Sequence, residues 1–395
     1  MSTQDLAYQI AFSKIPFLGS RQLTRLHKYF GDFNRAWNSN EFELVRAGLL
    51  PKTIRAILEH RSTIEPEREL EHVYKEHIKV VTLNDDDYPR LLKEISDPPH
   101  LLYYRGTISE YQPTIAIVGT RKTTSYGREV ARWLSSEIAK LGICVVSGLA
   151  LGIDAIAHQS ALEVQGATIA VLGSGLDQIY PQANSRLAQS IISSGALVSE
   201  FPLGTHAQKH HFPIRNRIIA GLSLGVIVIE GSNDSGSLIT AKVALDYNRE
   251  VLAVPGDIFR KTSEGTNKLI KLGAHPVASV QDVLGAFNLE KLEQKSASGL
   301  DTFSDSSLDS ESDSVSTLRN RRVDNISDFD NNQQHTRLSN EERIIISLLT
   351  REPRHIDEIV KLSKLQTNII NAALTTMELR GLIRHLGGMN YIRIL

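Results

Sequence analysis

The residues from Lys209 to Arg217 combine side chains that suit binding to a negatively charged polymer. The segment reads Lys-His-His-Phe-Pro-Ile-Arg-Asn-Arg, and no acidic residue occurs between Glu200 and Glu230. Lysine and arginine pair with phosphates, and an aromatic ring can stack on an unpaired base. The segment therefore predicts a site for a flexible polyanion whose units carry stackable rings.

Four other loops carry small or hydroxylated residues directly after an apolar run. They comprise residues 119–127, 147–154, 173–177 and 234–237. In an open α/β sheet, ligands bind beyond the carboxyl ends of the strands, where such loops meet. In the first loop, Gly119 permits close approach of an anion, Thr120 can donate a hydroxyl hydrogen bond, and Arg121 can grip two phosphate oxygens. Each loop alone is a weak signal, but together with the basic segment they predict a phosphate-binding edge.

These loops do not carry the motifs of nucleotide-binding proteins. The pattern is not Gly-x-Gly-x-x-Gly, and no Gly-Lys-Ser/Thr follows, which disfavours dinucleotide and nucleoside-triphosphate binding. Asp154 and His158 could imitate an acid/base pair, but no nucleophile or metal cluster accompanies them. We therefore interpret Asp154 as a capping residue and His158 as a structural histidine.

Two other kinds of functional site are also disfavoured by the residue types present. His210 and His211 have no cysteine or carboxylate partner at the spacing of metal ligands, so no metal or cofactor is expected. Glu200 and Glu230 end predicted strands and could be catalytic. We favour the interpretation that both acids cap loops or orient the two arginines of the basic segment.

Continuous apolar runs alternate with amphipathic stretches in the middle of the chain. The apolar runs are 115–118, 144–147, 168–172, 226–229 and 251–254, and the amphipathic stretches include 127–141, 183–192 and 236–248. Strands buried on both faces of a parallel sheet have continuous rather than alternating apolar character. The pattern predicts an α/β fold with an extended Rossmann-like, doubly wound and mostly parallel sheet.

Composition divides the chain into four segments. Residues 1–68 have apolar residues at helical spacing and resemble a sterile-alpha-motif or helix-hairpin-helix domain, with a small packing or protein-contact domain as the favoured alternative. Residues 69–288 carry the predicted sheet. Residues 289–337 are rich in serine and aspartate, which predicts a disordered acidic linker. We expect this linker to be a tether, although it could also occupy the basic segment when no ligand is bound.

The last segment, residues 338–395, predicts a winged helix. Three helical stretches precede two apolar runs, which are joined by a turn at Gly387 and Gly388. The expected recognition helix, 366–380, has no positive charge before Arg380. We therefore favour a protein-contact or weak DNA-binding role for this domain over sequence-specific reading of a duplex.

Charge and cysteine content restrict the class of protein further. The 395 residues carry a formal net charge of -1, so any binding to a polyanion must depend on a local patch. The single cysteine, Cys144, sits in an apolar run and fits a buried strand position in a reducing compartment. The sequence shows neither a secretion-signal pattern nor a membrane-spanning apolar run, which predicts a cytoplasmic protein with no membrane partner.

The ordered motifs between about residues 80 and 288 resemble those of the DprA (Smf) family. They are Gly119-Thr120-Arg121 with Tyr126-Gly127, Ser147-Gly148-Leu149-Ala150 with Gly152-Ile153-Asp154, Gly175-Leu176-Asp177 with Tyr180-Pro181, Phe212 to Gly221, Ser235-Gly236-Ser237, Val254-Pro255-Gly256 and Glu264-Gly265-Thr266-Asn267. Thr120 stands where many members carry serine, and the long acidic linker is atypical.

The resemblance implies a single-stranded DNA-binding protein of natural transformation. Such proteins protect the incoming strand, help to load the RecA recombinase, dimerise through the Rossmann-like domain and are not known as enzymes. The DNA-binding residues that the resemblance implies are Gly119, Thr120, Arg121, Ser147, Gly148, Gly173, Ser174, Lys209, Phe212, Arg215, Asn216, Arg217, Gly236 and Ser237.

Several of these residues have two possible roles. Phe212 could stack on a base or fill a hydrophobic gap before the helix, and Asn216 could read a base edge or cap a loop. Arg215 and Arg217 are expected in the same groove as Lys209. They diverge by about 200° on a helix, so we expect different roles for them, with one able to pair with Glu230.

Two rival functions fit parts of the sequence. A nucleotide-processing enzyme of the lysine-decarboxylase-like group shares the predicted fold, but residues 234–236 lack the Pro-Gly-Gly run and following Thr-x-x-Glu of that group. The other rival is a pure protein scaffold that does not bind DNA.

Overall fold

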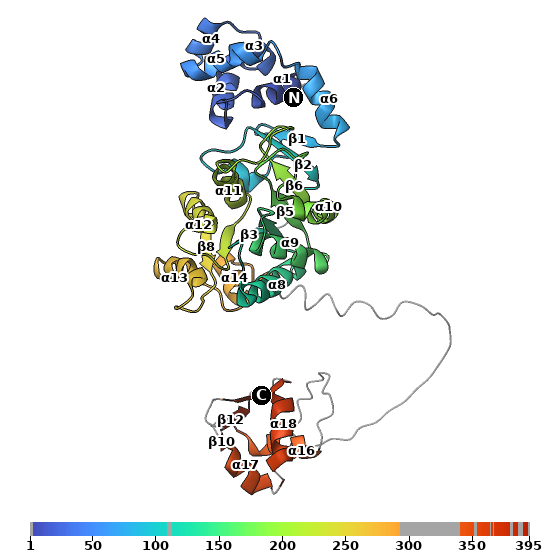
Figure 1. The fold of residues 1–395 in the computed structure, drawn as a ribbon, viewed down its shortest axis with the longest axis vertical. Coiled ribbons are helices and arrows are strands. Elements are labelled where there is room, and N and C mark those ends of the chain that lie inside the picture. Colours follow the sequence, from blue (N-terminus) through green and yellow to red (C-terminus); the bar gives the residue numbers. More distant parts are fainter. Residues whose placement is uncertain are drawn as a thin grey trace, which may run out of the picture. The chain divides into compact units, whose positions relative to one another are not determined.

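The computed structural model describes residues 3–108, 113–292, 340–350, 354–363, 365, 367–379, 382–385 and 390–393. They form two compact units, which are described separately (Figure 1). The first contains the N-terminal helices and the central sheet, and the second contains the C-terminal helices. Most of the expected linker, from residue 293 onward, lies outside the described residues, so its disorder stays a prediction.

A nine-stranded sheet forms the centre of the first unit, in the order β1-β2-β6-β5-β4-β3-β7-β8-β9. The strands are β1 (Lys79–Thr82), β2 (Leu101–Gly106), β3 (Thr114–Val118), β4 (Cys144–Ser147), β5 (Thr168–Val171), β6 (Ala196–Ser199), β7 (Gly225–Val228), β8 (Glu250–Ala253) and β9 (His275–Pro276). All neighbouring pairs from β6 to β9 are parallel. The expected mostly parallel, Rossmann-like sheet is confirmed.

Helices cover both faces of this sheet (Figure 1). On β3, Ala116 and Val118 pack with α11 and α12, whereas Ile115 and Ile117 pack with α8, α9 and α14. This alternation explains why the strand is continuously apolar from Ile115 to Val118. The helices are α7 (Arg90–Lys93), α8 (Ser125–Lys140), α9 (Ile153–Glu163), α10 (Ser185–Ser194), α11 (His211–Gly221), α12 (Gly236–Asp246), α13 (Glu264–Lys271) and α14 (Val280–Phe287).

The N-terminal helices pack directly on one end of this sheet. They are α1 (Thr3–Ser13), α2 (Ser20–Phe30), α3 (Phe33–Trp37), α4 (Glu41–Arg46), α5 (Pro51–His60) and α6 (Pro66–Lys75). Phe12, Leu26 and Phe33 are buried in a core of their own. Ala7 and Ile10 of α1 are buried in a second core that includes strands of the sheet. The expected boundary at residue 68 falls inside α6, so the helical region runs further than the sequence suggested.

The second unit has the elements expected of a winged helix. They are α16 (Asn340–Leu348), β10 (Arg354–His355), α17 (Ile356–Ser363), α18 (Thr367–Leu379), β11 (Ile383–His385) and β12 (Asn390–Arg393). The three strands form an antiparallel sheet in the order β10-β12-β11. Ile345, Ile359, Ile370 and Met377 fill its core. The turn at Gly387 and Gly388 lies outside the described residues.

Cys144 is buried at the start of β4, as predicted. Burial raises the pKa of its thiol to about 12, because the apolar surroundings disfavour the thiolate. None of the described helices combines the length and apolar character that a membrane crossing requires.

Candidate nucleic-acid interface

A cleft of about 500 Å³ opens beyond the carboxyl ends of the central strands. Its walls come from segments far apart in the sequence. These are residues 118–121 after β3, Ala150 and Asp154 after β4, residues 209–219 around the start of α11, and residues 232–240 around the start of α12. Three of the four predicted loops and the basic segment therefore meet at one edge of the sheet, whereas no residue of the loop 173–177 lines the cleft. We call this the first cleft.

The loop after β3 presents Arg121 at the rim of the first cleft. The backbone N–H of Thr120 donates to the carbonyl oxygen of Glu230 at 2.8 Å, which fixes the loop to the end of β7. The Thr120 hydroxyl accepts the N–H of Lys122 at 3.1 Å and so closes a local turn. Arg121 is exposed and forms no ion pair with any residue that the structure describes. Its guanidinium is therefore available to an anionic ligand.

Glu230 is buried and holds the start of α8. Its carboxylate accepts the Thr124 hydroxyl at 2.6 Å and the Thr124 N–H at 3.1 Å. Gly127 is required here, because a Cβ on it would lie 2.0 Å from Oε2 of Glu230. The expectation that Glu230 pairs with Arg215 or Arg217 is wrong. The Glu230 side chain instead caps the loop before α8. Loop capping was the other role predicted for this residue.

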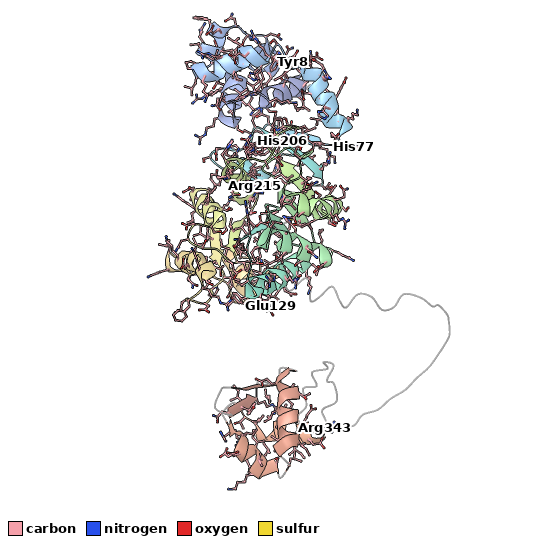
Figure 2. All side chains as sticks on the ribbon, viewed as in Figure 1. Tyr8, His77, Glu129, His206, Arg215 and Arg343 are labelled. Atoms are coloured by element: carbon pink, nitrogen blue, oxygen red, sulfur yellow. The ribbon has the colours of Figure 1, made fainter. Side chains whose placement is uncertain are left out.

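Arg215 lies at the floor of the first cleft and is only 4% exposed. Figure 2 shows it within the central domain. Its Nη1 donates to the carbonyl oxygens of Gly148 and Val171, and its Nε donates to Oδ1 of Asn216 at 3.1 Å. Burial lowers the pKa of Arg215 to about 10, and the nearby Asp154 carboxylate opposes this effect. Most of its donors are used internally, so Arg215 mainly joins the ends of β4 and β5 to α11.

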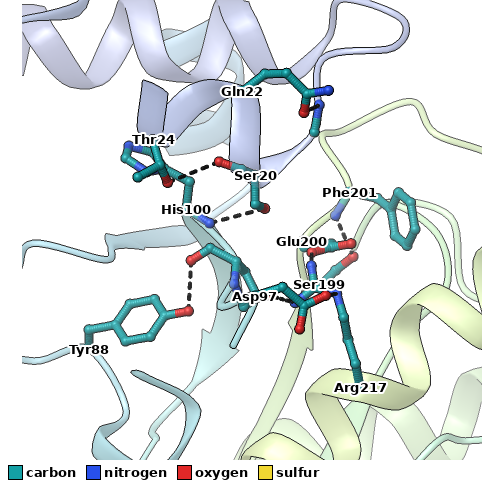
Figure 3. Close-up of polar contacts among 12 residues, drawn as sticks. Ser20, Gln22, Thr24, Tyr88, Asp97, His100, Ser199, Glu200, Phe201 and Arg217 are labelled. Atoms are coloured by element: carbon teal, nitrogen blue, oxygen red, sulfur yellow. Dashed lines mark hydrogen bonds and ion pairs between the residues drawn. The ribbon is translucent and has the colours of Figure 1, made fainter. Parts of the chain in front are cut away.

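Arg217 does not line the first cleft, and its contacts with Asp97 and Glu200 are shown in Figure 3. Its guanidinium forms an ion pair with the Glu200 carboxylate and donates to the carbonyl oxygen of Asp97 at 2.6 Å. The expectation that Glu200 orients one of the two arginines is confirmed. The expected placement of Arg217 in the same groove as Lys209 is wrong, because helical geometry puts it on the opposite side of α11 from Arg215.

Phe212 is a half-buried wall residue of the first cleft, not a fully buried plug. The Arg121 guanidinium lies 5.3 Å from its ring centroid, and the Arg215 guanidinium lies 5.8 Å away. The ring of Tyr180 is 5.8 Å from it in a tilted arrangement. Cations attract the face of an aromatic ring, so these neighbours hold Phe212 in place beside the cleft.

Lys209 is exposed and lines the same cleft, without an ion-pair partner in the described part of the chain. On the opposite wall, Gly236 and Ser237 begin α12, with the Ser235 hydroxyl as the N-cap. The first N–H groups of a helix carry partial positive charge and can bind anions. The first cleft thus combines two free cations with one helix N-terminus.

Some predicted DNA-binding residues do not present their side chains to the first cleft. The buried hydroxyls of Ser147 and Ser174 donate to the carbonyl oxygens of Ile117 and Gln178, each at 2.6 Å. Asn216 does line the first cleft, but its side chain is engaged, because Oδ1 accepts from Arg215 and Nδ2 donates to the Gly236 carbonyl oxygen at 3.5 Å.

Asn216 therefore matches the capping alternative better than the base-reading one. Gly119 lines the first cleft, whereas Gly148 and Gly173 lie beneath Arg215 and Phe212. Their absent side chains leave room for those two residues.

His158 has the predicted structural role, whereas Asp154 is not the predicted cap of α9, whose N-cap is Gly152, and instead holds the loop before that helix. The Asp154 carboxylate accepts the N–H groups of Gly148 at 3.2 Å and Ala150 at 3.4 Å. Burial raises the pKa of Asp154, and Arg215 partly offsets that effect. Nδ1 of His158 is 2.6 Å from the Thr168 hydroxyl, and burial lowers the pKa of this histidine to about 3. In the described residues, no group of three or more His, Cys, Asp or Glu could hold a metal ion.

Sequence reasoning did not assign Tyr180 to the site. It lies on a loop after β5 and is half exposed, with its ring against Phe212. A small slot near the first cleft is lined by both rings together with Arg121 and Leu151. The signal that could have assigned it to the site was its position beside Pro181, shortly after a glycine loop at a strand end.

Comparisons with known proteins agree with the motif pattern. The family model for DNA recombination-mediator protein A matches residues 79–288, and the model for the DprA winged helix domain matches residues 331–389. Protein Smf of Synechocystis sp. is 35% identical over 404 residues, which cover 100% of both chains. The chain belongs to the DprA/Smf family.

Other DprA proteins match mainly the central part of the chain. DNA processing protein DprA of Bacillus subtilis is 45% identical over 213 residues, which cover 53% of this chain and 72% of the relative. The X-ray structure of DNA processing protein A (DprA) from Streptococcus pneumoniae is similar, with a TM-score of 0.62 and 35% identity. That match covers 72% of this chain and 98% of the other. The first cleft lies entirely within the residues that the DprA family model matches.

Proposed function

We propose that this chain binds single-stranded DNA in the first cleft. The position of the Phe212 ring carries the proposal, because it lines the cleft beside the Arg121 guanidinium, 5.3 Å away. An unpaired strand offers a base to the ring and a phosphate to the guanidinium at the same time. In a duplex the bases are stacked and paired, so they are not available to Phe212. A preference for single strands follows.

Phosphate binding and base stacking come from different residues. Arg121 and Lys209 are exposed without ionic partners among the described residues, and they bind phosphates. The N–H group of Gly236 adds a second phosphate contact on the opposite wall, whereas the Ser237 N–H already donates to the Ser235 hydroxyl. Phe212 contributes stacking, which every base can provide. The geometry therefore favours binding that tolerates many sequences.

Membership of the DprA/Smf family supports a role in natural transformation. In this role the chain protects the incoming strand and helps to load the RecA recombinase onto it, in the cytoplasm. The description of the matched family model, DNA recombination-mediator protein A, supports the recombination step. RecA is accordingly the proposed protein partner.

We also propose that the chain forms a homodimer through its central domain. Large apolar side chains late in this domain support the proposal, since Ile258, Phe259 and Leu272 are 77%, 91% and 74% exposed. Ile258 and Phe259 are adjacent in the chain, and contiguous exposed apolar side chains are typical of protein–protein interfaces. Phe259→Asp should lower the molar mass measured by light scattering, whereas Phe42→Asp, which alters an exposed phenylalanine of α4, should not.

Binding without catalysis fits the contacts of Glu200 and Glu230 better than an enzymatic role. Glu200 is engaged by Arg217, and Glu230 by Thr124, so both carboxylates are held in structural contacts. A nucleotide-processing enzyme requires a carboxylate that can reach its substrate. Incubation with nucleoside monophosphates followed by product analysis should show no turnover. Release of a free base would favour the enzymatic alternative.

Titration of a labelled oligonucleotide at two salt concentrations tests the proposal. Single-stranded DNA should bind more tightly than the same sequence as a duplex, and its affinity should fall as salt rises. Equal affinity for both forms, or no binding to either, would remove the proposal. Complete absence of binding would favour a protein scaffold.

A further inference from the structure

A second cleft, of about 840 Å³, lies on the other side of α11 from the first. Residues 13–20, between α1 and α2, form one wall, and residues 200–217 contribute much of the other. Figure 3 shows members of both walls, with Ser20 and Gln22 on one side and Phe201 and Arg217 on the other. Because α1 shares a buried core with the sheet, the two walls belong to one compact unit.

The first turns of α11 form the ridge between the two clefts. Lys209 and Phe212 line the first cleft, whereas His210, Ile214 and Arg217 line the second. Residues 209 and 210 are consecutive and both exposed. A DNA strand that leaves the first cleft at Lys209 therefore meets a residue of the second cleft, His210, directly beside it in the chain.

The charged residues of the second cleft are already paired within the protein. Nζ of Lys14 lies 2.6 Å from the Glu69 carboxylate, and Arg217 pairs with Glu200. This differs from the first cleft, where Arg121 and Lys209 have no ionic partner in the described residues. The second cleft is thus poorly suited to phosphates. Its walls mix polar residues with apolar and aromatic side chains such as Phe17 and Phe201, and the latter suit uncharged, flat groups such as nucleobases.

Phe17 is the more exposed of the two phenylalanines that line the second cleft. Its side chain is 59% exposed, and its φ of 64° is in the left-handed region that phenylalanine rarely adopts. Nζ of Lys52 lies 3.4 Å from the ring centroid. An exposed aromatic ring on a strained backbone is typical of a binding position, because it has no role in the core that would justify the strain.

We propose that the second cleft holds bases of the same single strand that the first cleft binds, with Phe17 as the stacking platform. The strand crosses α11 at Lys209 and His210, so phosphates lie over the ridge and bases enter the second cleft. The volume falls within the range of about 300–1,000 Å³ that small-molecule pockets occupy, which is enough for a base. This inference rests on the proposed function of the first cleft, and it lengthens the proposed DNA-binding site.

Binding of oligothymidylates between about 4 and 16 nucleotides long separates the two clefts. For wild-type protein, affinity should rise with length beyond what the first cleft accommodates. Phe17→Ala should bind the shortest strand as wild type does, but lose roughly fivefold or more for the longest. Phe42→Ala is the matched control, because Phe42 is also exposed with a cation near its ring, Arg46 at 5.9 Å, but lies outside the cleft. Equal loss in both variants, or no loss in Phe17→Ala at any length, would overturn the inference.

A second measurement uses the unaltered protein and so does not depend on the folding of a variant. Oligonucleotides with 4-thiothymidine at successive positions should crosslink to the peptide containing Phe17 from some positions and to the Phe212 peptide from others. Crosslinks to Phe212 alone would overturn the inference while leaving the first cleft intact. If Phe17→Ala lowers the molar mass but not DNA binding, the cleft is an interface between copies of the chain, which also overturns it.

Discussion

The guanidinium of Arg215 occupies the space that a side chain on residue 148 would need. A Cβ on Gly148 would lie 2.5 Å from Nη1 of Arg215, closer than real contacts allow. The guanidinium cannot move away without breaking the hydrogen bonds that it donates to the Gly148 and Val171 carbonyl oxygens. This single contact fixes the floor of the first cleft.

Gly148→Ala should therefore destabilise the protein. The added methyl group displaces a buried, hydrogen-bonded charge, and overpacking of this kind costs about 1–3 kcal/mol. Urea denaturation measures the change in the free energy of unfolding. Gly236→Ala is the control, since its Cβ would meet nothing within 4 Å and its stability should stay close to wild type. Equal stability of Gly148→Ala and wild type would show that Arg215 can move freely.

Arg121→Glu should weaken binding to single-stranded DNA and flatten its salt dependence. Removal of one phosphate contact reduces the slope of log affinity against log salt by about 1. Lys140→Glu is the control, because it makes the same change in net charge at the C-terminal end of α8, away from the first cleft. Fluorescence anisotropy at several salt concentrations should separate the two variants. Lys209→Glu should behave as Arg121→Glu does, and unchanged slopes in both would refute the phosphate assignment.

Phe212→Ala should lose affinity without a change in salt slope. Stacking contributes about 1–3 kcal/mol per base and releases no counterions. The same anisotropy titration gives both quantities. Because the ring is only half-buried, the variant should keep its fold, which circular dichroism can check. A variant that unfolds would instead support the hydrophobic-plug alternative.

Two buried histidines predict that the protein loses stability in acid. Burial lowers the pKa of His158 to about 3 and of His100 to about 4, whereas both titrate near 6.5 in the unfolded chain. Below pH 6.5 the unfolded state binds protons that the folded state does not, so the free energy of unfolding falls. From pH 7 to 5 the loss is about 2 kcal/mol for each histidine.

Urea denaturation at pH 7 and pH 5 measures that loss. His158→Gln should reduce the difference between the two pH values, because it removes one of the two groups. His206→Gln, which changes an exposed histidine, should leave the difference as in wild type. A pH effect that is identical in all three proteins would contradict this origin.

The sequence predicted the parallel strands well because they are continuous apolar runs. It did not predict β1 and β2 at one side of the sheet, where β1 pairs antiparallel with β2 and β2 pairs antiparallel with β6. Tyr103, Tyr104 and Arg105 of β2 mix apolar and polar residues, so the run is less distinctive. The packing of the N-terminal helices against this side of the sheet was also not predicted, because β1 and β2 themselves were not.

Within the site, local geometry was predictable and distant pairing was not. Helical spacing alone showed that Arg215 and Arg217 face different directions. The pairing of Glu230 with Thr124 joins residues 106 apart in the sequence, and it depends on how β7 lies beside β3. The ring contact between Tyr180 and Phe212 likewise arises only after two loops are brought together.

The buried thiol of Cys144 makes the chain well suited to site-specific labelling. The sequence contains no other cysteine, and the raised pKa of this thiol keeps it protonated and unreactive at neutral pH. A cysteine introduced at an exposed position would therefore react with maleimide dyes without removal of the native residue. Pairs of such positions would allow distances between the central domain and the winged helix to be followed by energy transfer.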